Sequence, residues 1–279
     1  MDNGQQTTLE EQLTVASNLL SLQMQPFVTP ISGGLHDGAA VHVGTGGYIE
    51  WRLRRLLLTN EHVAREVKKY SLARKCFDSP DYVHINNPYQ VLTAPADLAI
   101  SPVDDRWNAV VHSAMAFPGH RFEEKHAPLQ GEYLFVMGFT GEKARYSPSF
   151  NTLFTIGTPY LTQEYDETLE PEQTKRPIKH PDFDPACHFA MQWHPDATTP
   201  TDGKTSSIPL DPHGMSGSLV WNTRLLEFAV SGETWTPGVA RLTGVLWGWD
   251  TGSRFLFATR IEHVTAFLAH LYPENRDVT

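Results

Sequence analysis

The sequence predicts an all-β fold, either a sandwich or a pair of barrels, with one helix near each end of the chain. Its apolar segments are mostly short, rich in Val, Ile, Phe, Tyr and Trp, and separated by Gly, Pro, Asn or Asp. The 279 residues include 20 Gly and 20 Pro, a composition that favours turns and strands over long helices. Many short strands of this kind are typical of sandwiches and barrels.

The elements follow one another in a simple order. Residues 8–24 carry apolar side chains close to helical spacing, and Thr8 with Glu11 three residues later forms the pattern of a helix-capping box. The predicted strands cover residues 39–44, 46–53, 54–60, 82–86, 97–101, 133–139, 154–161, 188–194, 218–222, 241–250 and 255–261. Residues 162–185 are polar and proline-rich, which indicates a long surface loop. Residues 261–271 repeat apolar side chains at helical spacing, so we expect a C-terminal helix that packs on the strands.

Composition excludes several classes of function. The net charge of −10 argues against a nucleic acid partner, because binding to phosphate backbones needs clustered Lys and Arg. The N-terminal residues lack the basic start and apolar run of a signal peptide, and no stretch approaches about 18 uninterrupted apolar residues. We therefore expect no membrane partner and a cytoplasmic location. Cys76 and Cys187 are too few for a disulfide framework and are predicted to be free, buried thiols in a reducing compartment.

Three segments carry the residues of a nucleophilic site. Ser216 lies in Gly-Met-Ser-Gly-Ser, where it is either a nucleophile or only a serine in a tight turn. A serine nucleophile needs a base and a group that holds the base. His62 follows the apolar run Leu-Leu-Leu and a short polar turn, and Asp97 opens the apolar run Leu-Ala-Ile, where a carboxylate needs a hydrogen-bonding partner. Asp104 and Asp105 compete with Asp97 for the role of the carboxylate.

The order His, Asp, Ser, with these local motifs, resembles that of the trypsin-like serine peptidases of the chymotrypsin fold. The resemblance covers about residues 38–271. It is strengthened by the Gly-rich segment 44–49, Gly138-Phe139 after an apolar run, the segment 244–249, and Ala-Thr-Arg-Ile at 258–261. It implies two six-stranded antiparallel β-barrels after an N-terminal helical segment. The boundaries that we expect are 1–30 for that segment, 31–125 for the first barrel, 126–272 for the second barrel with its helix, and 273–279 for the tail.

The resemblance implies a role for each matching residue. Ser216 would be the nucleophile, His62 the general base and later the acid, and Asp97 the carboxylate that fixes the imidazole tautomer. The N–H groups of Gly214 and Ser216 would form the oxyanion hole, and no cofactor or metal is expected. The residues expected to bind substrate are Leu210, His213, Leu246, Trp247 and Gly248. The histidines at 180, 188, 194 and 213 lack the paired spacing of zinc ligands and are interpreted as solvated or core residues.

The chain departs from the family at two positions beside the nucleophile. Met215 stands where the secreted digestive members have an aspartate that pairs with a newly cleaved N-terminus, and Ser218 stands where Gly is usual. With the missing disulfides, these departures indicate an intracellular relative of bacterial type. Leu210 at the expected pocket floor disfavours a pocket for Lys or Arg, whereas its neighbour Asp211 would reverse that prediction.

The sequence therefore predicts a serine endopeptidase that acts on protein or peptide substrates and is regulated by a partner protein or by the helix at 8–24. The alternative is a catalytically inactive member of the fold that binds a peptide or protein in its cleft, because Met215 and Ser218 alter the loop around the oxyanion hole. An α/β-hydrolase nucleophile elbow is disfavoured, because the segment before Ser216 is not a strand and the order of the three residues differs.

Overall fold

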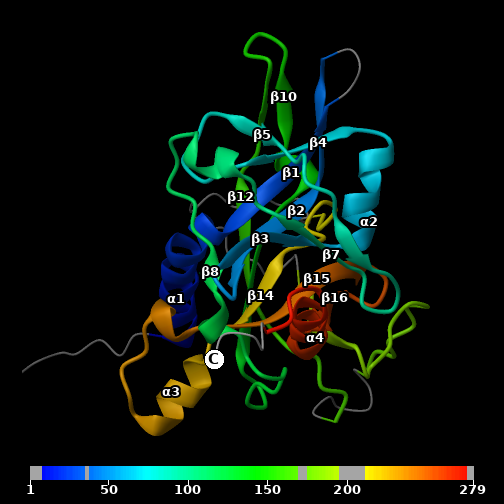
Figure 1. Ribbon diagram of the computed structural model, residues 1–279. Helices are drawn as coiled ribbons and strands as arrows, with labels where there is room; N and C mark the ends of the chain where they lie inside the picture. The colour runs from blue at the N-terminus through cyan, green and yellow to red at the C-terminus, as the bar shows by residue number, and fades with distance from the viewer. Residues whose placement is uncertain (1–7, 35–37, 169–174, 195–210, 275–279) are drawn as a thin grey trace, which may run out of the picture.

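The computed structural model describes residues 8–34, 38–168, 175–194 and 211–274, and its strands form two main sheets (Figure 1). The first is an eight-stranded sheet in the order β5-β4-β1-β2-β3-β7-β6, with β8 paired in parallel to β2. Its strands are β1 (Val28–Gly34), β2 (Ala40–Trp51), β3 (Arg54–Thr59), β4 (Ser71–Lys75), β5 (Tyr82–His84), β6 (Gln90–Leu92), β7 (Leu98–Pro102) and β8 (Phe117–Pro118). All its other pairs are antiparallel.

The second sheet has six antiparallel strands in the order β12-β9-β14-β15-β16-β13. They are β9 (Tyr133–Phe139), β12 (Gly157–Gln163), β13 (His188–Gln192), β14 (Leu219–Asn222), β15 (Arg241–Asp250) and β16 (Phe255–Arg260). The chain beyond β12 pairs with β13 through the bridge between Glu164 and Met191 and a 2.8 Å bond from the Tyr165 N–H to the Ala190 carbonyl. This contact closes the second sheet into a barrel.

The predicted all-β fold with a helix at each end is confirmed, although the first sheet differs in detail from a six-stranded barrel. Among the described residues, no strand pair joins β5 to β6, so the sheet stays open between its edges. The chain between them is held by side chains instead: the Asn87 Nδ2 donates to the Pro102 carbonyl, and the Ser101 hydroxyl donates to the Asn87 carbonyl. A separate hairpin of β10 (Arg145–Ser147) and β11 (Thr152–Phe154) projects from the second barrel.

Both predicted helices form. Helix α1 (Leu9–Met24) begins with the expected capping box, in which Thr8 and Glu11 bond each other's main-chain N–H. Its inner face and that of α4 (Ile261–Leu271) belong to one hydrophobic cluster together with buried residues of both sheets. The cluster includes Leu20 and Met24 from α1, Val264 and Leu268 from α4, and Leu58, Met137 and Leu219 from the sheets. Helix α1 is thus part of the core rather than an appendage. A further helix, α3 (Leu225–Ser231), follows β14.

The two thiols, Cys76 and Cys187, are buried and form no disulfide, which confirms their prediction as free cysteines. Among the described segments, no helix has the length and apolar character needed to cross a bilayer. The strands of the first sheet fall between residues 28 and 118 and those of the second between residues 133 and 260. The exact domain boundaries stay predictions.

Candidate active site

His62 and Asp97 meet as the sequence predicts. Strand β3 ends at Thr59, and His62 lies in the short helix α2 (Glu61–Ala64) that follows (Figure 1). Its Nδ1 lies 2.6 Å from Asp97 Oδ2, and its main-chain N–H donates to Asp97 Oδ1 at 3.0 Å. Because a carboxylate only accepts, the imidazole carries a proton on Nδ1, which leaves Nε2 as the acceptor in the neutral ring. The His62 side chain is 42% exposed, and its Nε2 has no hydrogen-bond partner among the described residues.

The carboxylate is presented by a tight turn, residues 94–97, that we call the Asp97 turn. Asp97 has a left-handed backbone with φ of +49°. Three successive carbonyls of the turn accept side-chain hydrogen bonds: Pro95 from His188 Nε2, Ala96 from the Thr259 hydroxyl, and Asp97 from Asn60 Nδ2, at 2.8, 2.8 and 2.9 Å. His188 and Thr259 belong to the second barrel, so the position of the carboxylate depends on both barrels.

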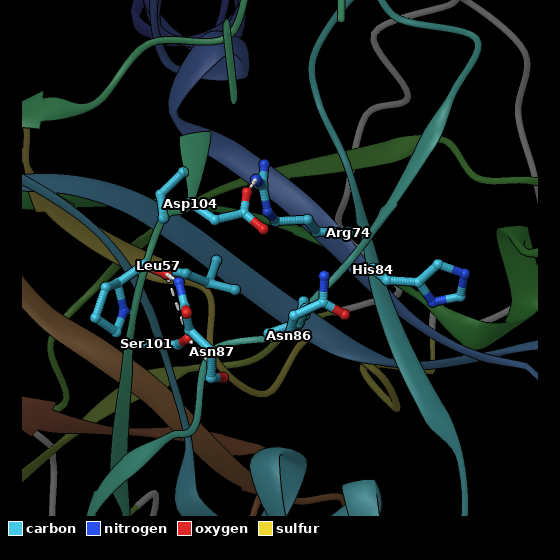
Figure 2. Close-up of a pocket in the computed structure, with 10 residues that line it drawn as sticks. Leu57, Arg74, His84, Asn86, Asn87, Ser101 and Asp104 are labelled. Carbon is cyan, nitrogen blue, oxygen red and sulfur yellow. Dashed lines mark hydrogen bonds and ion pairs between the residues drawn. The ribbon is translucent and has the colours of Figure 1, made fainter. Parts of the chain in front are cut away.

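The rival carboxylates lie elsewhere. Asp104 pairs with Arg74 at 3.4 Å, inside the first sheet, and Figure 2 shows the two side chains pointing toward each other. They line a cavity of about 10 Å³ together with Asn87 and Ser101, which is roughly the space of one water molecule. Asp105 begins a single turn of 3-10 helix. Neither of them hydrogen-bonds His62, so the choice of Asp97 as its partner is supported by the geometry.

Ser216 lies in a second turn, residues 213–218, that we call the Ser216 turn. It precedes β14 and packs across the barrel interface onto β2, where the Ser216 carbonyl accepts the Thr45 N–H at 2.8 Å. Gly217 has φ of +91°, and a Cβ at this position would lie 2.0 Å from the Thr45 carbonyl oxygen. Only glycine therefore allows this close approach. The same β2 segment meets the His62 helix, because a Cβ on Gly44 would touch both Val63 and the Ser216 carbonyl.

The Ser216 hydroxyl is buried and donates to the carbonyl of Trp247 at 3.3 Å. Within the described residues, no hydrogen bond joins this hydroxyl to His62. The structure thus brings His62 and Asp97 together directly, whereas it places Ser216 beside the same β2 segment with its hydroxyl turned to β15.

Two main-chain amides of the Ser216 turn are left free. The His213 carbonyl accepts the Gly141 N–H at 2.9 Å, and the Met215 carbonyl accepts both the N–H and the hydroxyl of Ser218, at 2.9 and 2.6 Å. Since a trans peptide points its N–H away from its carbonyl, these bonds direct the Gly214 and Ser216 amides to the opposite side. Neither amide has a hydrogen-bond partner among the residues that the structure describes.

The Gly214 carbonyl is held by two residues that sequence reasoning did not find. The Thr45 hydroxyl donates to it at 2.9 Å, and His42 Nε2 donates to it at 3.1 Å while also reaching the Phe139 carbonyl at 2.8 Å. His42 and Gly214 lie 172 residues apart, so no local pattern marks the contact. Burial lowers the pKa of His42 below its usual value of 6.5, which favours the neutral ring. Its Nδ1 is buried and finds no partner in the described structure.

Met215 and Ser218, on either side of the dipeptide Ser216-Gly217, each have a defined structural role. The Met215 side chain is fully buried in the core of the second barrel, against residues that include Val220 and Leu246. Apolar packing therefore anchors the residue that precedes Ser216. Ser218 supplies the hydroxyl bond to the Met215 carbonyl described above.

Of the described residues that are expected to bind substrate, all except His213 are buried. His213 is exposed and meets Trp249 edge-on, at 5.7 Å between ring centroids. Gly248 is buried, and the main-chain polar groups of Leu246 bond Gly217 and Ser218. Trp247 is 8% exposed, packed between His180, His188 and Phe257. Leu210 lies outside the described residues. Substrate binding by this set stays a prediction.

The cover over Trp247 comes from the predicted surface loop. Residues 175–187 contain no helix or strand, but Ile178 and Phe183 pack onto the cluster around Trp247 and Phe257. The sequence did not indicate this, because the apolar residues of the segment are separated by charged residues and prolines. The indole Nε1 of Trp247 is buried without a partner in the described structure.

No protein-family model and no curated protein sequence matches the chain. Solved structures resemble it at low identity. The active form of the Rv3671c protease from M. tuberculosis is 15% identical with a TM-score of 0.49, over 95% of this chain and 89% of that one. Tobacco etch virus protease in complex with product is 10% identical with a TM-score of 0.45, over 90% and 80%. These scores are too low to carry an argument, so the function is argued from the geometry of the site alone.

Proposed function

We propose that this chain is a serine endopeptidase. The observation that carries the proposal is the 2.6 Å contact between His62 and Asp97, which leaves the other imidazole nitrogen without a hydrogen-bond partner among the described residues. The Ser216 turn, which contacts the same β2 segment, has two amides without a partner in that part of the chain. A base held by a carboxylate and a pair of free donors are the two parts that acyl transfer by a serine requires.

In this proposal the reaction begins with a change at Ser216. Its hydroxyl leaves the Trp247 carbonyl by rotation about χ1 and donates to His62 Nε2, which takes the proton as Oγ attacks the substrate carbonyl. Asp97 stabilises the imidazolium that forms. The Gly214 and Ser216 amides bind the oxyanion, and His62 then gives its proton to the leaving amine. Water then takes the place of the amine. His62 takes a proton from the water as it attacks the acyl-enzyme, and returns the proton to Ser216 Oγ as the acid product leaves.

The turn needs no ion pair to hold these amides, in this proposal. The bonds from Gly141 and Ser218 already fix the two peptide planes, and Met215 is anchored by apolar packing. A donor that is oriented before the substrate arrives costs no reorganisation during the reaction. We therefore expect activity without cleavage of an N-terminal segment.

The bond between the Ser216 hydroxyl and the Trp247 carbonyl is the observation that favours the alternative, a catalytically inactive module that binds a peptide or protein. In that case the hydroxyl stays where it is, and the low exposure of Ser216 and Trp247 is permanent.

Fluorophosphonate labelling of the purified protein, read by intact mass, separates the two functions. We expect one adduct on the wild type, none on Ser216→Ala or His62→Ala, and one on Ser231→Ala, which removes an exposed serine in α3. A wild type that takes no label, alone or in cell lysate, contradicts the peptidase and leaves the binding module.

Regulation by a partner protein is part of the same proposal. A role of the N-terminal helix in it is better tested by a single surface substitution than by deletion. Removal of residues 1–30 would take Leu20, Met24 and Phe27 out of the shared core and destabilise the whole protein. Leu22 on the outer face of α1 is 71% exposed. Leu22→Glu should keep the fold, and a change in labelling rate or partner capture would then assign regulation to that face.

A further inference from the structure

A cavity of about 520 Å³ lies between the two barrels, within the range of roughly 300–1,000 Å³ that small-molecule sites occupy. Its walls come from β1, β9, the segment after β4 and the segment before β12. The apolar lining is Val28, Pro30, Phe77, Pro80, Met137 and Ile156. None of these side chains takes part in the His62, Asp97 and Ser216 site.

One cation lines this cavity without an acidic partner. Lys75, at the end of β4, is half-buried and forms no ion pair with a carboxylate among the described residues; its ammonium lies 5.5 Å from the centre of the Tyr82 ring. The carboxylate of Asp78, also in the lining, accepts a bond from the Ser113 hydroxyl at 3.2 Å. Burial lowers the pKa of Lys75, as expected for an ammonium that is desolvated without a counterion.

The walls suit an alkyl chain better than a peptide. Strand β1 is paired with β2 along its length and with β4 from Ile31 onward, and β9 is paired with β12 along its length and with β14 up to Met137. Next to the cavity, the Thr29 hydroxyl bonds both the N–H and the carbonyl of Lys75. A peptide bound between them would find few main-chain partners among the lining residues, because Pro30 has no N–H and the carbonyl and N–H of Phe139 already bond His42 and Thr45. An alkyl chain needs only apolar contact, which the lining provides, and its charged head needs the single cation.

We propose that this cavity binds an amphipathic carboxylate, a medium-chain alkyl acid with its chain between the barrels and its head on Lys75, and that the ligand acts on the Ser216 turn through Phe139. The first half of the proposal is independent of catalysis. The second half rests on the proposed peptidase function.

The connection to the site runs through the main chain of Phe139, which also lines the cavity. Its carbonyl accepts from His42 Nε2, and its N–H donates to the Thr45 hydroxyl. Both of these side chains donate to the Gly214 carbonyl. A ligand that shifts Phe139 therefore changes the two hydrogen bonds, from Thr45 and His42, that hold the Gly214 carbonyl. This carbonyl belongs to the peptide between Gly214 and Met215, which directly follows the peptide that carries the Gly214 N–H.

Binding is tested by calorimetry with decanoate and 1-decanol, below their aggregation limits, on the Ser216→Ala protein so that catalysis plays no part. We expect saturable binding of decanoate to the Ser216→Ala protein. Adding Lys75→Met should weaken this binding at least tenfold, whereas adding Lys75→Arg should preserve it. Decanol should bind all three proteins with the same affinity. Lys68→Met, on an exposed lysine away from the cavity, is the matched control. Absence of saturable decanoate binding, or equal affinity for Lys75→Met, overturns the site.

Coupling is tested by the rate of fluorophosphonate labelling of the protein with Ser216 intact. Saturating decanoate should change that rate at least threefold in wild type and in Lys68→Met, and at the same concentration should leave Lys75→Met unchanged. An unchanged rate in wild type that binds decanoate overturns the coupling. A protein that never labels contradicts the peptidase proposal and with it the coupling, while the calorimetry still decides whether the cavity binds the acid.

Discussion

The Asp97 turn and the Ser216 turn hold their main chains in opposite ways. In the Asp97 turn, side chains of Asn60, His188 and Thr259 donate to three successive carbonyls. In the Ser216 turn, main-chain N–H groups supply most of the bonds, and glycines at 214 and 217 supply left-handed backbone with φ of +94° and +91°. The first turn positions a carboxylate and the second leaves two amides free. Each should therefore be sensitive to a different kind of substitution.

The largest expected effect comes from the carboxylate of the Asp97 turn. Asp97→Asn keeps the size of the side chain but lets an amide donate toward His62 Nδ1, which favours the wrong tautomer. Labelling and peptide hydrolysis should fall about 10³–10⁴-fold with little change in melting temperature. Asp104→Asn is the matched control and should keep the rate, because Asp104 bonds Arg74 instead. Equal losses in both variants would mean that Asp97 is not the partner of a working base.

The next effect concerns the main chain of the Ser216 turn. Gly217→Ala adds a Cβ that would lie 2.0 Å from the Thr45 carbonyl and 2.3 Å from the Thr59 hydroxyl. We expect it to lower the free energy of unfolding by about 3 kcal/mol or more, from left-handed strain plus steric overlap. Gly232→Ala has a similar φ of +72° with open space around it and should lose only about 1–2 kcal/mol. Urea denaturation measures both. Similar losses would show that the barrels do not approach as closely as described.

The comparison also shows what the sequence could predict. His62 and Asp97 were found because each adjoins an apolar strand, and local patterning marks such positions. Both helices follow from the same periodicity, and the capping box at Thr8 follows from its motif. The predicted strands at 39–44 and 46–53 form the single strand β2, and the strands β1, β4, β6, β8, β10 and β11 were not predicted. The bonds of the Ser216 turn could not be predicted, because their donors, Gly141, Thr45 and His42, lie far away in the chain and have ordinary local contexts. The burial of Trp247 by residues 175–187 was missed for the same reason.

Ser218 gives a smaller and more selective effect. Its hydroxyl bonds the Met215 carbonyl at 2.6 Å, beside a main-chain bond from its own N–H to the same oxygen. Ser218→Ala removes only the hydroxyl bond, worth about 1–1.5 kcal/mol, so the labelling rate should fall roughly tenfold. Ser218→Gly, which also lacks the hydroxyl, should behave like Ser218→Ala if the bond matters. A rate unchanged in both variants would show that the main-chain bond alone orients the Ser216 amide.

The smallest expected effect is a pH dependence of stability that belongs to the Ser216 turn. The folded protein lowers the pKa of His42 below 6.5 because burial disfavours the charged ring, and a proton on Nδ1 would find no acceptor among the described residues. The unfolded chain then binds a proton more readily than the native state, so stability falls as the pH drops below about 6.5 and is constant with respect to this group above it.

The advantage of wild type over His42→Gln in urea unfolding should accordingly be full at about pH 7.5 and should shrink toward pH 5. His120→Gln, at an exposed position, controls for the loss of a histidine as such. An advantage that grows on acidification would mean that the protonated ring is favoured in the fold. His42 would then hold the Gly214 carbonyl as a cation, and the Ser216 turn would depend on a charged side chain, unlike the Asp97 turn.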